Sequence, residues 1–334
     1  MHYPFENSPA GGMTFEIAPG IDWVSMPLPY ALDHVNLWLL RDGGGWTVVD
    51  TGLAIDSIQA HWQTLLPKYP LTRQVVTHCH PDHLGLAAWL EERTGARLWM
   101  TQGEFAVAHL LRASIDDYSY AAMVKFFALH GLDEARQQGL TTRGNAFLRG
   151  VPAMPRTFVR LLDGEKIRID EHDWRVISGT GHSPEHAALY CEKRHVLISG
   201  DMLLPRITTN VFVLAATPES DALQQYLDSI DRFRTLPANT LVLPSHGKPF
   251  HGLHERIDQL HRHHRQRCKL LVDACQTPRS AAELLPTLFD RDISDPHQLQ
   301  FAMGETIAHL NHLDARQRLI HVNDGGIRRY VIPH

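Results

Sequence analysis

Residues 77–85 read THCHPDHLG and place three histidines and one aspartate within six positions. The stretch continues from RQVVTH, an apolar run typical of a short buried strand. In extended backbone His78 and His80 fall on the same side, and the chain then turns so that Asp82 and His83 present their side chains in other directions. One zinc site rarely takes four ligands from a single turn, so we predict that these side chains are divided between two adjacent metal ions.

Three further candidate ligands follow β-rich runs elsewhere in the chain. They are His182 in SGTGHSPEH, Asp201 in LISGDML and His246 in VLPSHGKP. Each lies beside a glycine or another small residue, where backbone can pass close to a bound ion. Because α/β proteins commonly place their chemistry at strand ends, we predict that these three residues complete the metal site.

Strand-like and helix-like segments alternate around these motifs. HVNLWLLRD and WTVVDTG, separated by glycines, predict a hairpin, and EKIRI, WRVIS, HAALYCE, HVLISGD and NTLVLPSHG predict later strands. SIQAHWQTLL and LGLAAWLEERTG have helical spacing, and the second helix is expected to end at Gly95. The pattern predicts an α/β (α+β) fold with the ligands in its loops.

Residues 103–160 change character and read as a helical insertion. Its apolar side chains, which include Met123, Phe126, Phe127 and Met154, can either form an ordinary helical layer or line a substrate pocket. The sequence leaves both alternatives open.

The last part of the chain is mainly helical. Three helical segments precede LIHVNDGGIRRYVI, in which Asp-Gly-Gly between two β-rich runs predicts a hairpin. We therefore expect a small winged-helix-like domain over residues 254–334, following a catalytic domain over residues 1–253.

The composition is that of a globular protein. A chain of 334 residues can bury a sizeable core, and its formal net charge of -5 gives no general attraction for nucleic acid or anionic lipid. Four cysteines without CxxC spacing fit a reducing compartment. The first residues lack a signal-peptide pattern, and no apolar run reaches about 18 residues. We expect a cytoplasmic protein without a membrane partner.

The ordered motifs resemble those of the metallo-β-lactamase superfamily over roughly residues 15–255. The resemblance rests on HxHxDH, followed by a GHSPEH histidine, a GD aspartate and an SHG histidine. It implies an αββα sandwich, in which two mixed sheets pack face to face with helices outside. It also implies two divalent metal ions, one held by His78, His80 and His182 and a second held by Asp82, His83 and His246, with Asp201 bridging both.

Several residues near these motifs are expected to have roles other than metal binding. Asp50 in VVDTG matches a family aspartate that is expected to orient ligands rather than to bind metal. Leu86 stands where the similar glyoxalase II motif THxHxDHxGG has its second glycine, which weakens a glutathione-thioester assignment. Lys248 could hold a substrate carboxylate or phosphate, or be an ordinary exposed lysine. His186 could donate a hydrogen bond in a pocket or simply end a strand, and Cys79 is expected to be a structural thiol.

The metal pair predicts the class of reaction. Two divalent ions lower the pKa of a shared water, so we expect a metal-bound hydroxide to hydrolyse a small-molecule thioester, ester or lactone. Asp82 is the candidate catalytic residue that accepts the proton of this water and passes it to the leaving group. Zinc suits the imidazole and carboxylate ligands, and iron or manganese suit them as well.

Two alternative activities come from the same resemblance. The whole chain resembles β-lactamase-like hydrolases that carry a C-terminal winged-helix-like domain, a group related to a mitochondrial endoribonuclease, so the alternative is an endoribonuclease or phosphodiesterase. A persulfide dioxygenase would need redox-active iron. Residues 255–334 carry roughly balanced charges, with Arg328 and Arg329 as a local exception, which disfavours nucleic acid as a partner. We therefore expect this region to cover the substrate or to form a homodimer.

Overall fold

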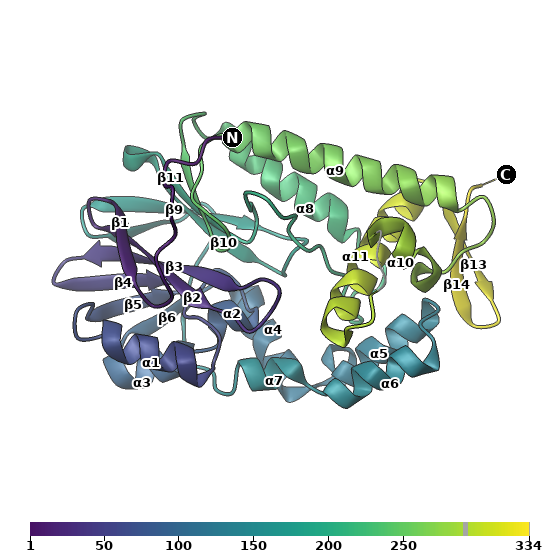
Figure 1. Ribbon diagram of the computed structural model, residues 1–334, viewed down its shortest axis with the longest axis horizontal. Helices are drawn as coiled ribbons and strands as arrows, with labels where there is room; N and C mark the ends of the chain where they lie inside the picture. The colour runs from purple at the N-terminus through teal and green to yellow at the C-terminus, as the bar shows by residue number, and fades with distance from the viewer. Residues whose placement is uncertain (290–292, 334) are drawn as a thin grey trace.

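A computed structural model of the chain describes residues 1–289 and 293–333, and residues 290–292 and 334 lie outside the described part. Two mixed β-sheets pack face to face (Figure 1). The first sheet follows chain order and contains β1 (Thr14–Ala18), β2 (Ile21–Pro27), β3 (His34–Asp42), β4 (Gly45–Val49), β5 (Leu71–Val75), β6 (Arg97–Met100) and β7 (Val159–Arg160). The second has the order β12–β11–β10–β9–β8 and contains β8 (Lys166–Ile169), β9 (His172–Gly179), β10 (His186–Cys191), β11 (Val196–Gly200) and β12 (Leu241–Pro244).

Helices cover the outer face of each sheet (Figure 1). The first sheet is covered by α1 (Asp56–Leu65) and α3 (Ala87–Thr94), and the second by α8 (Ala222–Asp231) and α9 (Leu253–Ala274). The predicted αββα sandwich is therefore confirmed. The predicted end of the helix at Gly95 is also confirmed, because this residue caps α3 with a φ of 73°.

Alternation along the strands explains why two sheets pack together. In β3, Trp38 and Leu40 point into the apolar layer between the sheets, whereas Leu37 and Leu39 point toward α1 and α3. All four side chains are at most 2% exposed. A strand buried on both faces reads as a nearly continuous apolar run, as HVNLWLLRD does.

The segment predicted as an insertion is helical. It contains α4 (Gln102–Ala113), α5 (Tyr120–Leu129), α6 (Glu134–Arg143) and α7 (Ala146–Gly150). Met123, Phe126 and Phe127 are buried in one large core cluster together with side chains from the C-terminal helices. Met123 and Phe127 therefore belong to the core layer, whereas Phe126 belongs to this cluster and also lines a cavity between α5 and the C-terminal hairpin. Met154 is partly buried against a separate cluster beside α4.

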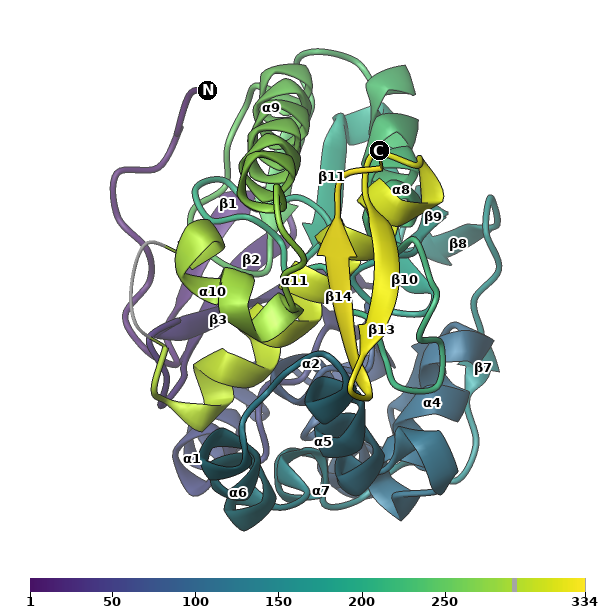
Figure 2. The ribbon, with the colours of Figure 1, turned by 90° about the vertical axis from the view of Figure 1, so that its right-hand side faces the viewer.

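The C-terminal region has the predicted order of elements. After α9 come α10 (Ala281–Phe289), α11 (Pro296–Ala315) and a hairpin of β13 (Ile320–Asp324) and β14 (Ile327–Val331). Gly325 and Gly326 form the hairpin turn with φ values of 60° and 85°, a conformation that side chains with a Cβ disfavour. The hairpin lies beside α5 (Figure 2). The division at residues 253 and 254 stays a prediction.

Candidate metal centre

The turn that carries the motif is built by a strand followed directly by a short helix. Val75 ends β5, and Pro81 begins α2 (Pro81–Leu84), where the missing N–H of proline leaves no helical hydrogen bond unmade. His78 and His80 therefore precede the helix in extended backbone, while Asp82 and His83 lie within its only turn. The conformation separates the four side chains into two pairs, as the spacing predicts.

One group of candidate ligands contains His78, His80, His182 and Asp201. His78 Nε2 lies 2.9 Å from His80 Nδ1 and 3.2 Å from His182 Nε2. Asp201 Oδ2 lies 3.5 Å from His182 Nε2 and 3.9 Å from His78 Nε2. Residues from three separate loops thus converge on one point.

The second group contains Asp82, His83 and His246. Asp82 Oδ2 lies 3.5 Å from the Nε2 atoms of both His83 and His246. The other carboxylate oxygen of Asp201, Oδ1, faces the same group at 3.7 Å from His83 Nε2 and 3.3 Å from His246 Nε2. Asp201 therefore presents one oxygen to each group, the arrangement that a bridging ligand requires.

Hydrogen bonds on the far side of each ring fix which nitrogen faces the centre. His182 Nδ1 donates to the Asn210 carbonyl (2.7 Å) and His246 Nδ1 to the His34 carbonyl (2.7 Å). His83 Nδ1 donates to Asp50 Oδ2 at 2.8 Å. Because a carbonyl or carboxylate oxygen can only accept, each of these Nδ1 atoms carries the proton. When such a ring is neutral, its Nε2 has a lone pair directed at the centre, as in metal sites.

Asp50 orients ligands of both groups. Its carboxylate accepts from His83 Nδ1 and also from the backbone N–H (2.8 Å) and hydroxyl (3.0 Å) of Thr77. Since the Thr77 hydroxyl gives its proton to Asp50, its oxygen accepts from His78 Nδ1 at 2.9 Å. Asp50 is 1% exposed and has a φ of 65°. Asp50 belongs to neither group of candidate ligands, which agrees with its expected orienting role.

The chemistry of the donor set fits a cation. His78 Nε2 and His182 Nε2 face each other at 3.2 Å with lone pairs, and such an approach is repulsive unless a positive charge lies between them. Among the described residues, His83 Nε2 and Asp201 Oδ1 are buried and have no hydrogen-bond partner. A buried polar atom without a partner is costly, and a metal ion would satisfy both.

Burial favours the neutral form of His78 and His80. It lowers the pKa of His80 to about 3, with a further contribution from His182. Burial also lowers the pKa of His78 well below its ordinary value, and the neighbouring His83 and His80 add to this effect. Neutral imidazole is the form that binds metal.

Two ligands mark the side from which the centre can be reached. His80 and Asp82 are partly exposed, whereas the other five candidate ligands are buried. The side chain of Asp82 is 20% exposed and that of His83 is 0% exposed. The accessible side of the centre therefore lies at His80 and Asp82, the second of which is the predicted proton acceptor.

Several neighbours of the motif have structural roles. His186 stacks on His78 with ring centroids 4.9 Å apart, and its Nε2 accepts from the Asp201 backbone N–H at 3.2 Å. His186 is the first residue of β10, so the strand-end alternative is correct for its position, and from there it supports two candidate ligands. Leu86 is 1% exposed and fills the apolar layer under α3. Lys248 donates to the Glu6 carbonyl, so its ammonium group is engaged with the N-terminal segment.

Glu104 is a supporting residue that the sequence analysis missed. This carboxylate is 0% exposed and lies in the first turn of α4. It accepts from the Cys79 backbone N–H (2.9 Å), the Ser183 hydroxyl and the Glu185 backbone N–H (2.7 Å). It thereby ties the loop of His78 and His80 to the loop of His182. Its sequence signal is one acidic residue in the apolar run EFAVAHLL. Cys79 itself is 2% exposed, and burial and Glu104 raise the pKa of its thiol, as a structural thiol requires.

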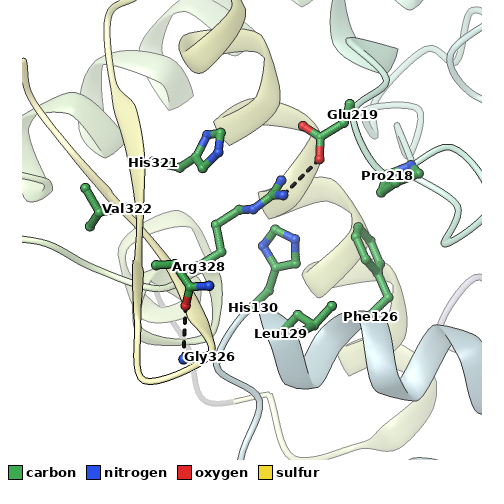
Figure 3. Close-up of a pocket in the computed structure, with 10 residues that line it drawn as sticks. Phe126, Leu129, His130, Pro218, Glu219, His321, Val322, Gly326 and Arg328 are labelled. Atoms are coloured by element: carbon green, nitrogen blue, oxygen red, sulfur yellow. Dashed lines mark hydrogen bonds and ion pairs between the residues drawn. The ribbon is translucent and has the colours of Figure 1, made fainter.

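A separate cavity of about 320 Å³ lies between α5, the loop at Pro218 and Glu219, and the C-terminal hairpin (Figure 3). Arg328 lines it and pairs with Glu219 at 2.9 Å. None of the seven candidate ligands lines this cavity. It is therefore distinct from the metal centre. No helix among the described residues has the length and apolar character needed to cross a bilayer.

Comparisons with known proteins agree with this geometry. Residues 30–246 match the family described as "Metallo-beta-lactamase superfamily", and residues 268–332 match "Metallo-beta-lactamase-like, C-terminal domain". A crystal structure of a β-lactamase domain protein from Burkholderia ambifaria is similar, with a TM-score of 0.93 and 45% identity over 99% of this chain and 98% of that chain.

Two curated relatives carry hydrolase names. A probable metallo-hydrolase of Bacillus subtilis, YqjP, is 25% identical over 316 residues, which cover 89% of this chain and 92% of the relative. A hydroxyacylglutathione hydrolase of Pseudomonas savastanoi pv. phaseolicola is 26% identical over 220 residues, covering 65% of this chain and 63% of that protein.

Proposed function

Because the chain belongs to the metallo-β-lactamase superfamily, whose members typically bind divalent metals, we propose that it is a metal-dependent hydrolase. The proposed cofactor is a pair of divalent cations, and zinc is the metal that we propose for both positions. The proposed substrates are small-molecule thioesters, esters or lactones. The observation that carries the proposal is the position of Asp201, whose two oxygens face two separate groups of histidines. When bound, such cations activate a water molecule and polarise the carbonyl group that it attacks.

The proposed role of Asp82 is to move a proton. Its Oδ2 lies 3.5 Å from the Nε2 atoms of both His83 and His246, and its side chain is 20% exposed, against 10% for Asp201. From this position it accepts a proton from the attacking water and passes it to the leaving oxygen or sulfur. General acid–base transfer of this kind contributes about 10²–10⁴-fold in rate.

The charges of the C-terminal region support a small-molecule substrate over nucleic acid. Arg328 pairs with Glu219 at 2.9 Å (Figure 3), and Arg329 pairs with Glu283 at 2.7 Å and with Asp324 at 3.1 Å. The positive charges of Arg328 and Arg329, the two adjacent basic residues of the C-terminal hairpin, are thus compensated by carboxylates. Nucleic-acid affinity depends on basic side chains that are free to neutralise phosphates.

Metal analysis of the purified protein is the first test. We expect about two equivalents of divalent metal per chain in the wild type and a loss of metal in His78→Ala. His109→Ala is the matched control, because His109 is an exposed histidine on α4 outside the candidate centre. Equal metal content in His78→Ala and wild type would contradict the proposed site. Bound iron with oxygen-dependent oxidation of a persulfide would instead indicate a dioxygenase.

A substrate panel is the second test. Thioesters, esters, lactones, phosphodiesters and single-stranded RNA are compared with the same metal-loaded enzyme. We expect hydrolysis of acyl substrates, reduced about 10²–10⁴-fold in Asp82→Asn preparations that retain metal. Cleavage of RNA without acyl hydrolysis would overturn the substrate class. Full acyl hydrolysis by metal-loaded Asp82→Asn would overturn the role of Asp82 alone.

A further inference from the structure

Two arginines beside the metal centre have no carboxylate partner among the described residues. Arg143 ends α6, and its guanidinium donates to His297 Nδ1 at 2.9 Å and to Gln300 Oε1 at 3.4 Å. Arg149 in α7 donates to the Arg143 carbonyl at 2.8 Å. By contrast, Arg136 on the same helix α6 pairs with Asp133. The positive charges of Arg143 and Arg149 are therefore positioned by neutral acceptors and remain uncompensated within residues 1–289 and 293–333.

His297 holds Arg143 in a defined orientation. Because the guanidinium can only donate, His297 Nδ1 accepts and the ring is neutral. Burial and the charge of Arg143 lower the pKa of His297, which agrees with that state. The His297 ring also packs against Tyr30 with centroids 4.8 Å apart and against Phe301 at 5.0 Å. Tyr30 comes from the loop between β2 and β3, so three separate parts of the chain meet here.

A series of direct contacts links this place to the metal centre. The carbonyl of Asn210 orients the candidate ligand His182, and the Asn210 amide donates to the Phe301 carbonyl at 3.4 Å. Phe301 in turn contacts His297, the acceptor for Arg143. The Phe301 side chain is 37% exposed and offers an apolar surface along this path.

Arg149 lies next to the turn that carries the candidate ligands. Gly150, which follows Arg149, packs so closely on Pro81 that a Cβ at Gly150 would lie 2.5 Å from the Pro81 Cβ. Pro81 directly precedes Asp82. Tyr30 lies within electrostatic range of Asp82 and of both arginines. Burial and the charge of Asp82 raise the pKa of the Tyr30 hydroxyl, whereas Arg143 and Arg149 lower it.

We propose that Arg143 and Arg149, together with Tyr30, bind a carboxylate or phosphate group at the end of the substrate remote from the scissile bond. Arginine presents a planar fork of donors that matches either anion, and Tyr30 adds a hydroxyl. Phe301 then contacts the apolar part of the substrate between the anion and the reacting carbonyl. The inference rests on the proposed function and narrows it to anionic acyl substrates.

The kinetic test compares matched acyl thioesters of N-acetylcysteamine. Succinyl, adipoyl and suberoyl thioesters carry a terminal carboxylate, and butyryl, hexanoyl and octanoyl thioesters end in a methyl group. We expect the metal-loaded enzyme to prefer one carboxylate-bearing member over its methyl-ended partner about tenfold to hundredfold in kcat/KM, mainly through KM. Arg143→Gln should abolish the preference, Arg143→Lys should restore part of it, and the control Arg136→Gln should keep it. No preference for any carboxylate-bearing member would overturn the proposal.

A second readout does not depend on hydrolysis. Phenylglyoxal modifies accessible arginines, and the labelling rates of Arg143 and Arg149 are followed by peptide mass spectrometry. We expect succinate or inorganic phosphate to slow this labelling, whereas neutral succinamide should have no effect. The anion that slows labelling more strongly identifies the group that the site recognises. Labelling of Arg136 serves as the internal control. If the acyl substrates are not hydrolysed but protection is seen, the proposed function fails and the anion site stands. Equal labelling rates in all solutions would refute the anion site.

Discussion

Glu305 should make the protein less stable as the pH rises from about 4.5 to about 7. This carboxylate lies on α11, is 7% exposed, and accepts one hydrogen bond from the Asn210 amide at 3.2 Å. Burial raises its pKa from the ordinary value of 4.5 to about 7, although Arg267 and Asn210 oppose the shift. The folded protein therefore keeps the Glu305 proton over a pH range in which the unfolded chain loses it.

The size of the effect follows from this difference in pKa. Where the folded state binds more protons than the unfolded state, the free energy of unfolding falls with rising pH. Each pKa unit corresponds to about 1.4 kcal/mol, so the buried carboxylate destabilises the fold by about 1 kcal/mol at pH 5 and by about 3 kcal/mol at pH 8. Glu305→Gln removes this dependence. The variant should gain about 2 kcal/mol on the wild type between pH 5 and pH 8.

Urea unfolding at the two pH values measures this gain. The protein is first stripped of metal with EDTA, because a cation beside His182 would itself affect the charge of a nearby carboxylate. Glu171→Gln is the control, since Glu171 is exposed and has no ion pair among the described residues. If the free energies of unfolding of Glu305→Gln and wild type differ by the same amount at both pH values, the reasoning is refuted. A change in packing alone would give such a constant difference, because packing does not depend on pH.

The remaining predictions concern the metal centre and its backbone. Asp50→Asn should weaken metal binding about 10–100-fold in a zinc titration, because Asp50 orients His83 and, through Thr77, a ligand of the other group. Gly181→Ala should lower the free energy of unfolding by about 1–3 kcal/mol in urea, since Gly181 has a φ of 93° and a Cβ there would lie 2.4 Å from the Ala222 carbonyl oxygen. EDTA should lower the Tm and added zinc should restore it, with a stabilisation of about 4 kcal/mol per site at a thousandfold excess over Kd; an unchanged Tm would argue against bound metal.

The candidate ligands could be predicted because each carries a local signal. His78, His182 and His246 are polar side chains at the ends of apolar runs, and the structure brings them together with the other four ligands. The two-sheet architecture was implied by the resemblance that these ordered motifs carry, and runs such as HVNLWLLRD, which are buried on both faces, fit it. Strand-end position and apolar periodicity are properties of short segments, which a single sequence displays.

The partners of these ligands could not be predicted in the same way. Asn210 orients His182 through its backbone carbonyl, a group that every residue possesses. The contact between Arg143 and His297 joins positions 154 residues apart, and nothing in either segment identifies the other. Lys248 was expected to face either substrate or solvent, but the N-terminal segment passes beside it and offers the Glu6 carbonyl. Such contacts depend on how distant segments pack.

The hydrogen bond between His182 and Asn210 means that the metal centre does not belong to the β-sandwich alone. Asn210 is anchored from α11 by the Phe301 carbonyl and by Glu305, so a C-terminal helix restrains the loop that orients one ligand. We therefore expect metal affinity to fall when the packing of the C-terminal helices is disturbed. A fragment that ends before α11 would contain every candidate ligand and still lack the support that fixes the orientation of His182.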